Sequence, residues 1–127
     1  MSKEIKARLR RDWDRAWNQG DLAAIDELYA ADVVIHTAAP GTPAGIEGVK
    51  LSVGGLRAAF PDLQFTLEDL IVEGDVAVNR WSISGTQQGE FMGAPPTGEK
   101  TTMSGLAMVR LAHGKVVEIW TAMFPAA

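Results

Sequence analysis

Apolar residues recur every three or four positions over the first stretch of the chain, with lysines and arginines between them. This spacing is that of an amphipathic helix packed on a core. The apolar stripe consists of Ile5, Leu9, Trp13, Ala16 and Trp17. Gly20 favours the end of this helix, because glycine readily adopts the left-handed conformation of a helix terminus. Asp21 is a good N-cap for a helix that follows at once.

Two further helices and one short strand are predicted before Pro61. The second helix has an apolar stripe of Leu22, Ile25, Leu28 and Tyr29. Residues 32–36, DVVIH, are rich in β-branched side chains and predict a strand. Residues 37–48 contain two prolines and three glycines and predict a loop. A third stripe, which predicts a helix stopped by Pro61, consists of Val49, Val53, Leu56 and Phe60.

After Pro61 the pattern changes to strands. Tight turns with glycine at residues 73–75, EGD, and 112–115, AHGK, predict antiparallel hairpins. Helices followed by an antiparallel meander predict an α+β fold, with one curved sheet and the helices on one face. A length of 127 residues without repeats predicts a single domain over residues 1–127. The predicted strands are residues 63–73, 76–90, 100–111 and 115–123.

Residues 93–100, GAPPTGEK, come within one residue of a phosphate-binding P-loop. A P-loop requires a lysine where Glu99 stands, and a helix after it. The segment that follows here alternates like a strand, and Pro95 and Pro96 lack the amide hydrogens that hold phosphates. We therefore interpret the segment as a connection between two strands and expect no nucleotide binding.

Composition excludes several classes of function. The net charge is −4, so a nucleic acid is not an expected partner. The chain has no cysteine, which excludes disulfides and thiol nucleophiles. No apolar run is long enough for a membrane span, and the N-terminus lacks the apolar core of a signal peptide, so a cytoplasmic protein without membrane contact is expected. Two distant histidines and scattered acids show no metal-ligand spacing, so no metal site is expected.

Residues 85–100, GTQQGEFMGAPPTGEK, closely resemble a segment of the SnoaL-like polyketide cyclase (ester cyclase) family of the nuclear transport factor 2-like superfamily. Residues 17–36, 58–81 and 114–120 resemble other parts of this family in the same order, so the resemblance covers nearly the whole chain. It implies a cone-shaped α+β barrel, with three N-terminal helices packed in a strongly curved antiparallel sheet around a deep apolar pocket. It also implies a homodimer formed through the outer face of the sheet.

The resemblance also implies a reaction. Ester cyclases of this family close a polyketide ring by intramolecular aldol condensation, without a metal or an organic cofactor, and use an Asp near the end of the last strand as acid and base. In this chain no acid follows Glu118, and the last aspartate is Asp75. Two functions remain open. One is a cofactor-independent aldol cyclase, or a related lyase or isomerase, acting on an apolar carbonyl compound. The other is a non-catalytic binding or carrier protein.

His36 and Glu118 are the predicted catalytic residues. His36 ends the first strand and matches a position where the family often has a pocket histidine, so we expect it to be the main ionisable group of the pocket. Glu118 and Trp120 share one side of the last strand, so Glu118 faces the pocket if Trp120 does. The alternatives are a surface histidine and a solvated glutamate paired with Arg110. The remaining acid candidates are Asp12, Asp14, Glu68, Asp69 and Glu90.

The predicted ligand-binding residues are mostly large and apolar. Four tryptophans in a chain with one tyrosine suggest an aromatic-lined pocket, with packing in the core as the alternative. Strand alternation places either Arg80 or Trp81 inside, and the neighbouring pattern leaves both options open. Tyr29 is interpreted as a core residue, which argues against a tyrosine proton donor of the ketosteroid isomerase type. The methionines Met92, Met103, Met108 and Met123 are interpreted as core fillers. The predicted pocket residues are Trp13, Trp17, Arg80, Trp81, Met103 and Trp120.

Overall fold

The computed structural model describes residues 2–91 and 93–125, so the prediction for Met92 lies outside the described residues. The described residues form three helices and then, with one early exception, strands. None of these helices is long and apolar enough to cross a membrane. In chain order the elements are α1 (Ser2–Trp17), α2 (Leu22–Leu28), β1 (Tyr29–Ile35), α3 (Ile46–Ala59), β2 (Gln64–Glu73), β3 (Val76–Thr86), β4 (Lys100–Ala112) and β5 (Lys115–Pro125).

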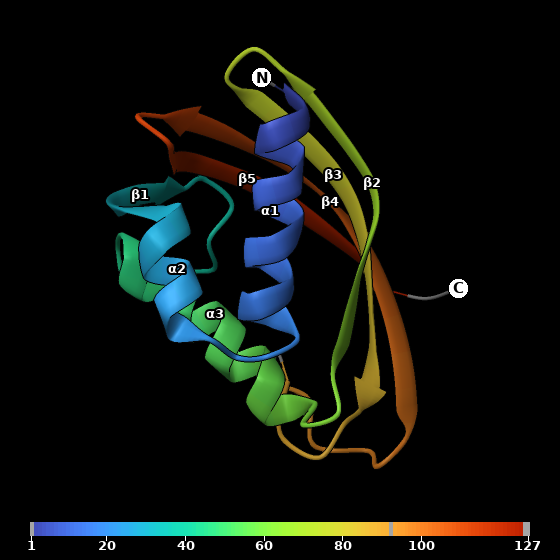
Figure 1. The fold of residues 1–127 in the computed structure, drawn as a ribbon. Coiled ribbons are helices and arrows are strands. Elements are labelled where there is room, and N and C mark those ends of the chain that lie inside the picture. The colour runs from blue at the N-terminus through green and yellow to red at the C-terminus, as the bar shows by residue number, and fades with distance from the viewer. Residues whose placement is uncertain (1, 92, 126–127) are drawn as a thin grey trace.

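The five strands form one sheet in the order β1-β5-β4-β3-β2. Strands β2 to β5 are antiparallel neighbours, as the hairpin turns predict. The prediction of a wholly antiparallel sheet is wrong at one edge, because β1 pairs with β5 in parallel. Parallel neighbours need a crossover connection, and here the chain from α3 to β4 supplies it. The architecture is nonetheless the expected α+β cone, with the helices on the concave face of a curved open sheet (Figure 1).

Short connections determine where α2, β1 and β5 begin. The carboxylate of Asp21 accepts a hydrogen bond from the amide of Ala23 at 3.0 Å and caps α2, as predicted. The β4–β5 hairpin turns at His113 and Gly114, which both have positive φ, as a two-residue turn of type I′ requires. Strand β1 begins directly after α2, so Tyr29 belongs to a strand rather than to the second helix.

The core is divided into two clusters. The larger cluster lies between the helices and the sheet and includes Leu9 and Trp13 of α1, Ile25 of α2 and Val116 of β5. The smaller cluster lies at the C-terminal end of α3 and consists of Ala59, Phe60, Leu63, Ile83 and Met103. Val49 and Val53 of α3 also belong to the larger cluster, so α1 and α3 pack on one core, and Figure 1 shows both helices on the concave side of the sheet.

The connection between β3 and β4 contains the P-loop-like residues 93–100. It joins antiparallel strands and leads into β4, as the sequence predicts, so no helix follows it. The side chain of Gln87 is buried and its Nε2 donates to the carbonyl oxygens of Gly89, Ala94 and Pro95 at 3.1–3.3 Å. The ring of Phe91 packs edge-on against Phe60, with ring centroids 5.3 Å apart. The described part of this connection therefore contacts the end of α3 through Phe91 and through the amides of Gln88 and Gly89, which donate to the carbonyl oxygen of Ala59.

Candidate functional site

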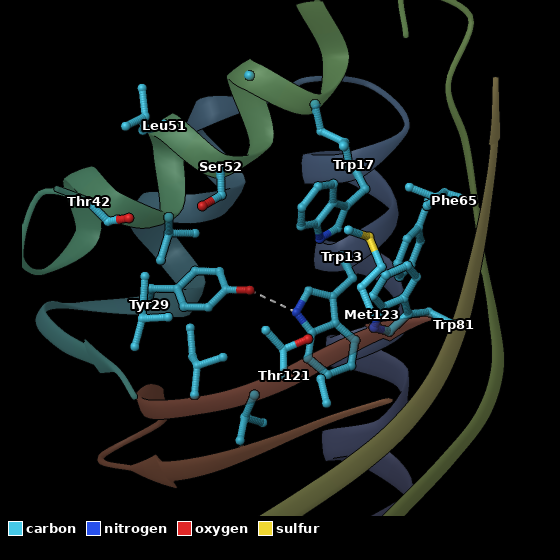
Figure 2. A pocket seen from close by; sticks show the side chains of 18 of the residues that line it. Trp13, Trp17, Tyr29, Thr42, Leu51, Ser52, Phe65, Trp81, Thr121 and Met123 are labelled. Carbon is cyan, nitrogen blue, oxygen red and sulfur yellow. Dashed lines mark hydrogen bonds between the residues drawn. The ribbon is translucent and has the colours of Figure 1, made fainter. Parts of the chain in front are cut away.

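A cavity of about 510 Å³ lies between the concave face of the sheet and the helices α1 and α3. Its walls are mainly aromatic and aliphatic, with a few polar side chains (Figure 2). Such a lining suits a small molecule with an apolar framework and a small number of polar groups. The lining residues used below are Trp13, Trp17, Tyr29, Phe65, Asn79, Trp81, Glu90, Ala107, Ile119, Thr121 and Met123.

The floor of the cavity is built from rows of residues that face each other across neighbouring strands. One row joins Asn79 of β3, Ala107 of β4 and Thr121 of β5. The next row joins Trp81, Gly105 and Met123. A Cβ atom on Gly105 would lie 2.2 Å from Cζ2 of Trp81, so only glycine leaves room for the indole at this point. The small residues Gly105 and Ala107 of β4 therefore leave space for the Trp81 indole and for the cavity.

The aromatic wall comes from both layers of the fold. Trp17 at the end of α1 stacks on Phe65 of β2, with ring centroids 5.9 Å apart. Figure 2 shows these two rings and Trp81 on the same side of the cavity. Trp13, Trp17 and Trp81, which were predicted to bind a ligand, all line the cavity, and ligand binding by them stays a prediction.

Tyr29 and Trp13 form a buried polar pair in the middle of this apolar lining. The indole Nε1–H of Trp13 donates a hydrogen bond to the Tyr29 hydroxyl at 3.0 Å, and both residues are less than a tenth exposed. No acceptor for the hydroxyl proton of Tyr29 is found among the described residues. Burial raises the pKa of Tyr29 to about 12, which outweighs the opposite effect of the hydrogen bond from Trp13. The phenol is therefore protonated at neutral pH and is a hydrogen-bond donor.

Asn79 is the other buried polar residue of the cavity. Its side chain is 4% exposed, and its Oδ1 has no hydrogen-bond partner within the described part of the chain. Unpaired buried oxygens are rare in folded proteins. Glu90, carried by the β3–β4 connection, is the one carboxylate among the described lining residues, and it is exposed. In residues 2–91 and 93–125, no three His, Asp or Glu side chains lie close enough to hold a metal ion.

The predicted catalytic pair lies outside the cavity. Ile119, Thr121 and Met123 of β5 face the cavity, so Glu118 and Trp120 point to the outer face of the sheet. Nε2 of His36 lies 2.9 Å from Oε2 of Glu118, and the imidazole stacks on Trp120 with ring centroids 4.4 Å apart. The expectation that His36, Glu118 and Trp120 line the pocket is wrong. The shared side of Glu118 and Trp120 was inferred correctly, but that side is the outer one.

Two further predicted pocket residues also lie elsewhere. Arg80 points outward and forms an exposed ion pair with Asp69, with 2.7 Å between Nε and Oδ2. Met103 is buried, but it pairs with Ile83 one row beyond Trp81 and packs in the smaller core cluster. Alternation along β3 explains the position of Arg80, because its neighbour Trp81 lies on the inner side.

Sequence reasoning missed Tyr29 and Asn79 as cavity residues. Tyr29 lies in register with an apolar helical stripe, so the helix appeared to continue through it although a strand begins there. The sequence around Asn79 did contain a signal that its side chain faces the interior. Ala77, Trp81 and Ile83 share its side of β3 and are apolar, whereas the opposite side carries Arg80 and Ser82. A single polar residue on the apolar side of a strand marks a polar group that faces the interior.

The profile of the SnoaL-like polyketide cyclase family matches residues 7–123. TsrD from Streptomyces laurentii superposes with a TM-score of 0.89 at 27% identity, over 97% of this chain and 90% of that one. AclR from Streptomyces galilaeus, a candidate hydroxylase, has a TM-score of 0.82 at 33% identity, over 98% and 91%. IdmH from Streptomyces antibioticus, a candidate polyketide cyclase, has a TM-score of 0.73 at 41% identity, over 86% and 84%.

No curated protein matches this chain. The profile match covers most of the sequence, and the solved structures share the helices, the curved sheet and nearly the full length. The chain belongs to the SnoaL-like polyketide cyclase family.

Proposed function

We propose that the protein binds a polyketide-like carbonyl compound in the cavity and promotes its ring closure by an aldol reaction. The observation that carries this proposal is the Trp13–Tyr29 pair, with the indole 3.0 Å from the hydroxyl. The resemblance of the chain to IdmH, a candidate polyketide cyclase, supports the substrate class. The site needs a group that stabilises the negative oxygen formed when a carbonyl is attacked, and a buried neutral phenol is such a group.

The hydrogen bond from Trp13 determines what Tyr29 can do. The hydroxyl oxygen accepts a hydrogen bond from the indole N–H (Figure 2). The proton of the hydroxyl itself therefore remains available for a hydrogen bond to a ligand in the cavity. The surrounding apolar walls keep water away, which strengthens a hydrogen bond to developing negative charge. Because the pKa of Tyr29 is raised to about 12, the group donates rather than removes a proton at neutral pH. A separate group has to act as the base.

Glu90 is the base in this proposal. Glu90 is the acidic residue that lines the cavity, and it lies on the β3–β4 connection. Glu90 takes a proton from a carbon next to a carbonyl group, which leaves an enolate. The enolate carbon then attacks a second carbonyl carbon, which forms the C–C bond of the ring. The oxygen of that carbonyl, hydrogen-bonded by Tyr29, becomes the alkoxide and takes up the proton that Glu90 removed, so Glu90 is a carboxylate again and Tyr29 keeps its proton.

A carrier function is the second candidate, and a specific observation favours it. The resemblance places a catalytic Asp near the end of the last strand. The residues of β5 that face the cavity are Ile119, Thr121 and Met123, and none of them ionises. A cavity without a base close to Tyr29 still binds an apolar ligand. Conversion of a bound substrate to product therefore distinguishes the cyclase function from the carrier function.

We also propose that the protein is a homodimer formed through the outer face of the sheet. Val78, Met108 and Trp120 form an apolar row across three neighbouring strands on this face. Leu106 and Phe124, on the same face, are 46% and 47% exposed. Exposed apolar side chains that gather on one face mark an interaction surface. A two-fold dimer brings the same face of both copies together.

The raised pKa of Tyr29 predicts a loss of stability in alkali. The folded protein holds the phenol proton more tightly than the unfolded chain, so the contribution of Tyr29 is complete below pH 10 and is lost as the pH rises toward 12. The loss approaches about 3 kcal/mol of unfolding free energy, since each pKa unit corresponds to about 1.4 kcal/mol. Tyr29 is the single tyrosine of the chain, so phenolate absorbance reports it alone. Titration of native Tyr29 at the value of the denatured chain would show that the hydroxyl is not buried.

Replacement of Tyr29 by phenylalanine should slow ring closure while the ligand still binds. We expect Tyr29→Phe to lower kcat by about 10² to 10³, the usual effect of removing one oxyanion donor. Glu90→Gln should lower kcat by about 10² to 10⁴ if Glu90 is the base. The assay follows the cyclisation of a synthetic aryl 1,3,5-triketone by the absorbance of the aromatic product, which forms when the aldol adduct loses water.

His36→Ala is the control for this experiment, because His36 lies outside the cavity. It should cyclise the triketone at the wild-type rate. An unchanged kcat in Tyr29→Phe would contradict the assigned role of Tyr29. If the wild-type protein binds the triketone without closing the ring, the carrier function holds in place of the cyclase.

A charge on the outer face should separate the dimer into monomers. Leu106→Glu places a carboxylate on the outer face beside the apolar row and should yield a monomer at micromolar concentration, as measured by light scattering after gel filtration. Leu22→Glu, on α2, also replaces an exposed leucine and should remain a dimer. A wild-type monomer under these conditions, or a dimeric Leu106→Glu variant, would refute this interface.

A further inference from the structure

We infer that Asn79 selects the ligand by binding a phenolic or enolic hydroxyl group at the deep end of the cavity. This inference rests on the proposed function, because it requires the ligand to occupy the cavity. It adds a substrate class to that proposal, namely an elongated ring system with a hydroxyl group at the end that is bound deepest.

The first argument is the unpaired oxygen of Asn79. The side chain is 4% exposed and lines the cavity, and within the described residues nothing donates to its Oδ1. Keeping a buried acceptor unpaired destabilises the folded protein. An apolar residue at this position would give a more stable folded protein, so the stability of the fold does not explain the asparagine. A bound group that donates a hydrogen bond to the carboxamide removes that cost.

The second argument is the space around the carboxamide. Asn79 faces Ala107 on the neighbouring strand, and Ala77 precedes it on the same side of β3. These small side chains leave space beside the carboxamide for a flat ligand that lies along the sheet, while Oδ1 itself is enclosed in the structure. The terminal torsion of asparagine is broad, so the carboxamide can turn its oxygen toward such a ligand.

The third argument is the row that Asn79 shares with Thr121. Ala107 lies between the two residues, so they are two strand spacings apart, or about 10 Å. The Thr121 hydroxyl donates to the carbonyl oxygen of Leu106 at 3.3 Å and keeps its oxygen as an acceptor. Asn79 is buried and Thr121 is exposed, so the row runs from the deep end of the cavity to its open end. Two polar positions at this separation fit an elongated, flat molecule with oxygen substituents at both ends.

The charge of the lining determines which polar group fits. No lysine, arginine or histidine is among the described residues that line the cavity. A carboxylate or phosphate would therefore be buried without a counter-charge, which is strongly unfavourable. A carbonyl cannot donate to Oδ1, whereas a hydroxyl group both donates and accepts and satisfies a carboxamide in either orientation. A neutral phenol or enol is the group that meets these conditions.

A matched pair of probes tests this inference. The probes are 2-naphthol and 2-methoxynaphthalene, which share the ring system and differ in the hydrogen-bond donor. Apolar burial alone favours the methoxy compound, because its methyl group adds apolar surface. If Asn79 binds the hydroxyl, the wild-type protein should bind 2-naphthol about tenfold or more tightly than the ether. The dissociation constants are measured by isothermal titration calorimetry.

The variant Asn79→Leu has a side chain of similar size without polar atoms. It should lose the preference for 2-naphthol and bind the methoxy compound at least as tightly, and its melting temperature should equal or exceed that of the wild type because the unpaired oxygen is gone. Asn79→Asp, protonated in this apolar setting, keeps an acceptor and should retain the preference for 2-naphthol. Ser82→Ala, on the outer side of the same strand, should behave as the wild type.

The outcomes distinguish this inference from the proposed function. Equal affinity of the wild-type protein for both probes, or a preference for 2-naphthol that persists in Asn79→Leu, would overturn the role of Asn79 and leave the cavity as a binding site. If neither probe binds, the result contradicts both the role of Asn79 and the proposed binding function. A folded Asn79→Leu variant with a clearly lowered melting temperature would show that Asn79 supports the fold, which also contradicts the inference.

Discussion

The hydrogen bond from Trp13 to Tyr29 links the two layers of the fold at the centre of the cavity. Trp13 comes from α1 and Tyr29 from the first position of β1, and both are buried. If the bond were lost, an indole N–H and a phenol oxygen would be left unpaired in an apolar interior, which is costly. The bond therefore fixes how α1 lies on the sheet edge. It also leaves the Tyr29 proton as the donor that the cavity offers to a ligand.

The alternation of side chains along β3, β4 and β5 gives the sheet two faces with different roles. The inner face combines Trp81, Asn79 and Thr121 around the cavity. The outer face carries an apolar row together with charged pairs such as Arg80 with Asp69. A shift of one residue in the pairing would exchange these faces. The same register that builds the cavity floor therefore also creates the surface proposed for the dimer.

The local signals in the sequence were sufficient for the elements and the fold class. The helical stripe of α1 and the glycine turns at residues 74 and 114 predicted their elements correctly, because these features depend on neighbouring residues. The parallel pairing of β1 with β5 joins segments far apart in the sequence, and no local pattern encodes it. The site was predicted less well for the same reason. The direction in which His36 and Glu118 point depends on which face of the sheet the helices cover.

The central claim is that the Tyr29 hydroxyl donates a hydrogen bond to an oxygen of the bound ligand. Infrared spectroscopy of a bound ketone tests it directly, with 2-acetylnaphthalene labelled with carbon-13 at the carbonyl as the probe. A hydrogen bond from Tyr29 should lower the carbonyl stretching frequency of the bound probe in the wild-type protein relative to the Tyr29→Phe variant. The same frequency in both proteins, with the probe bound in each, would contradict the claim.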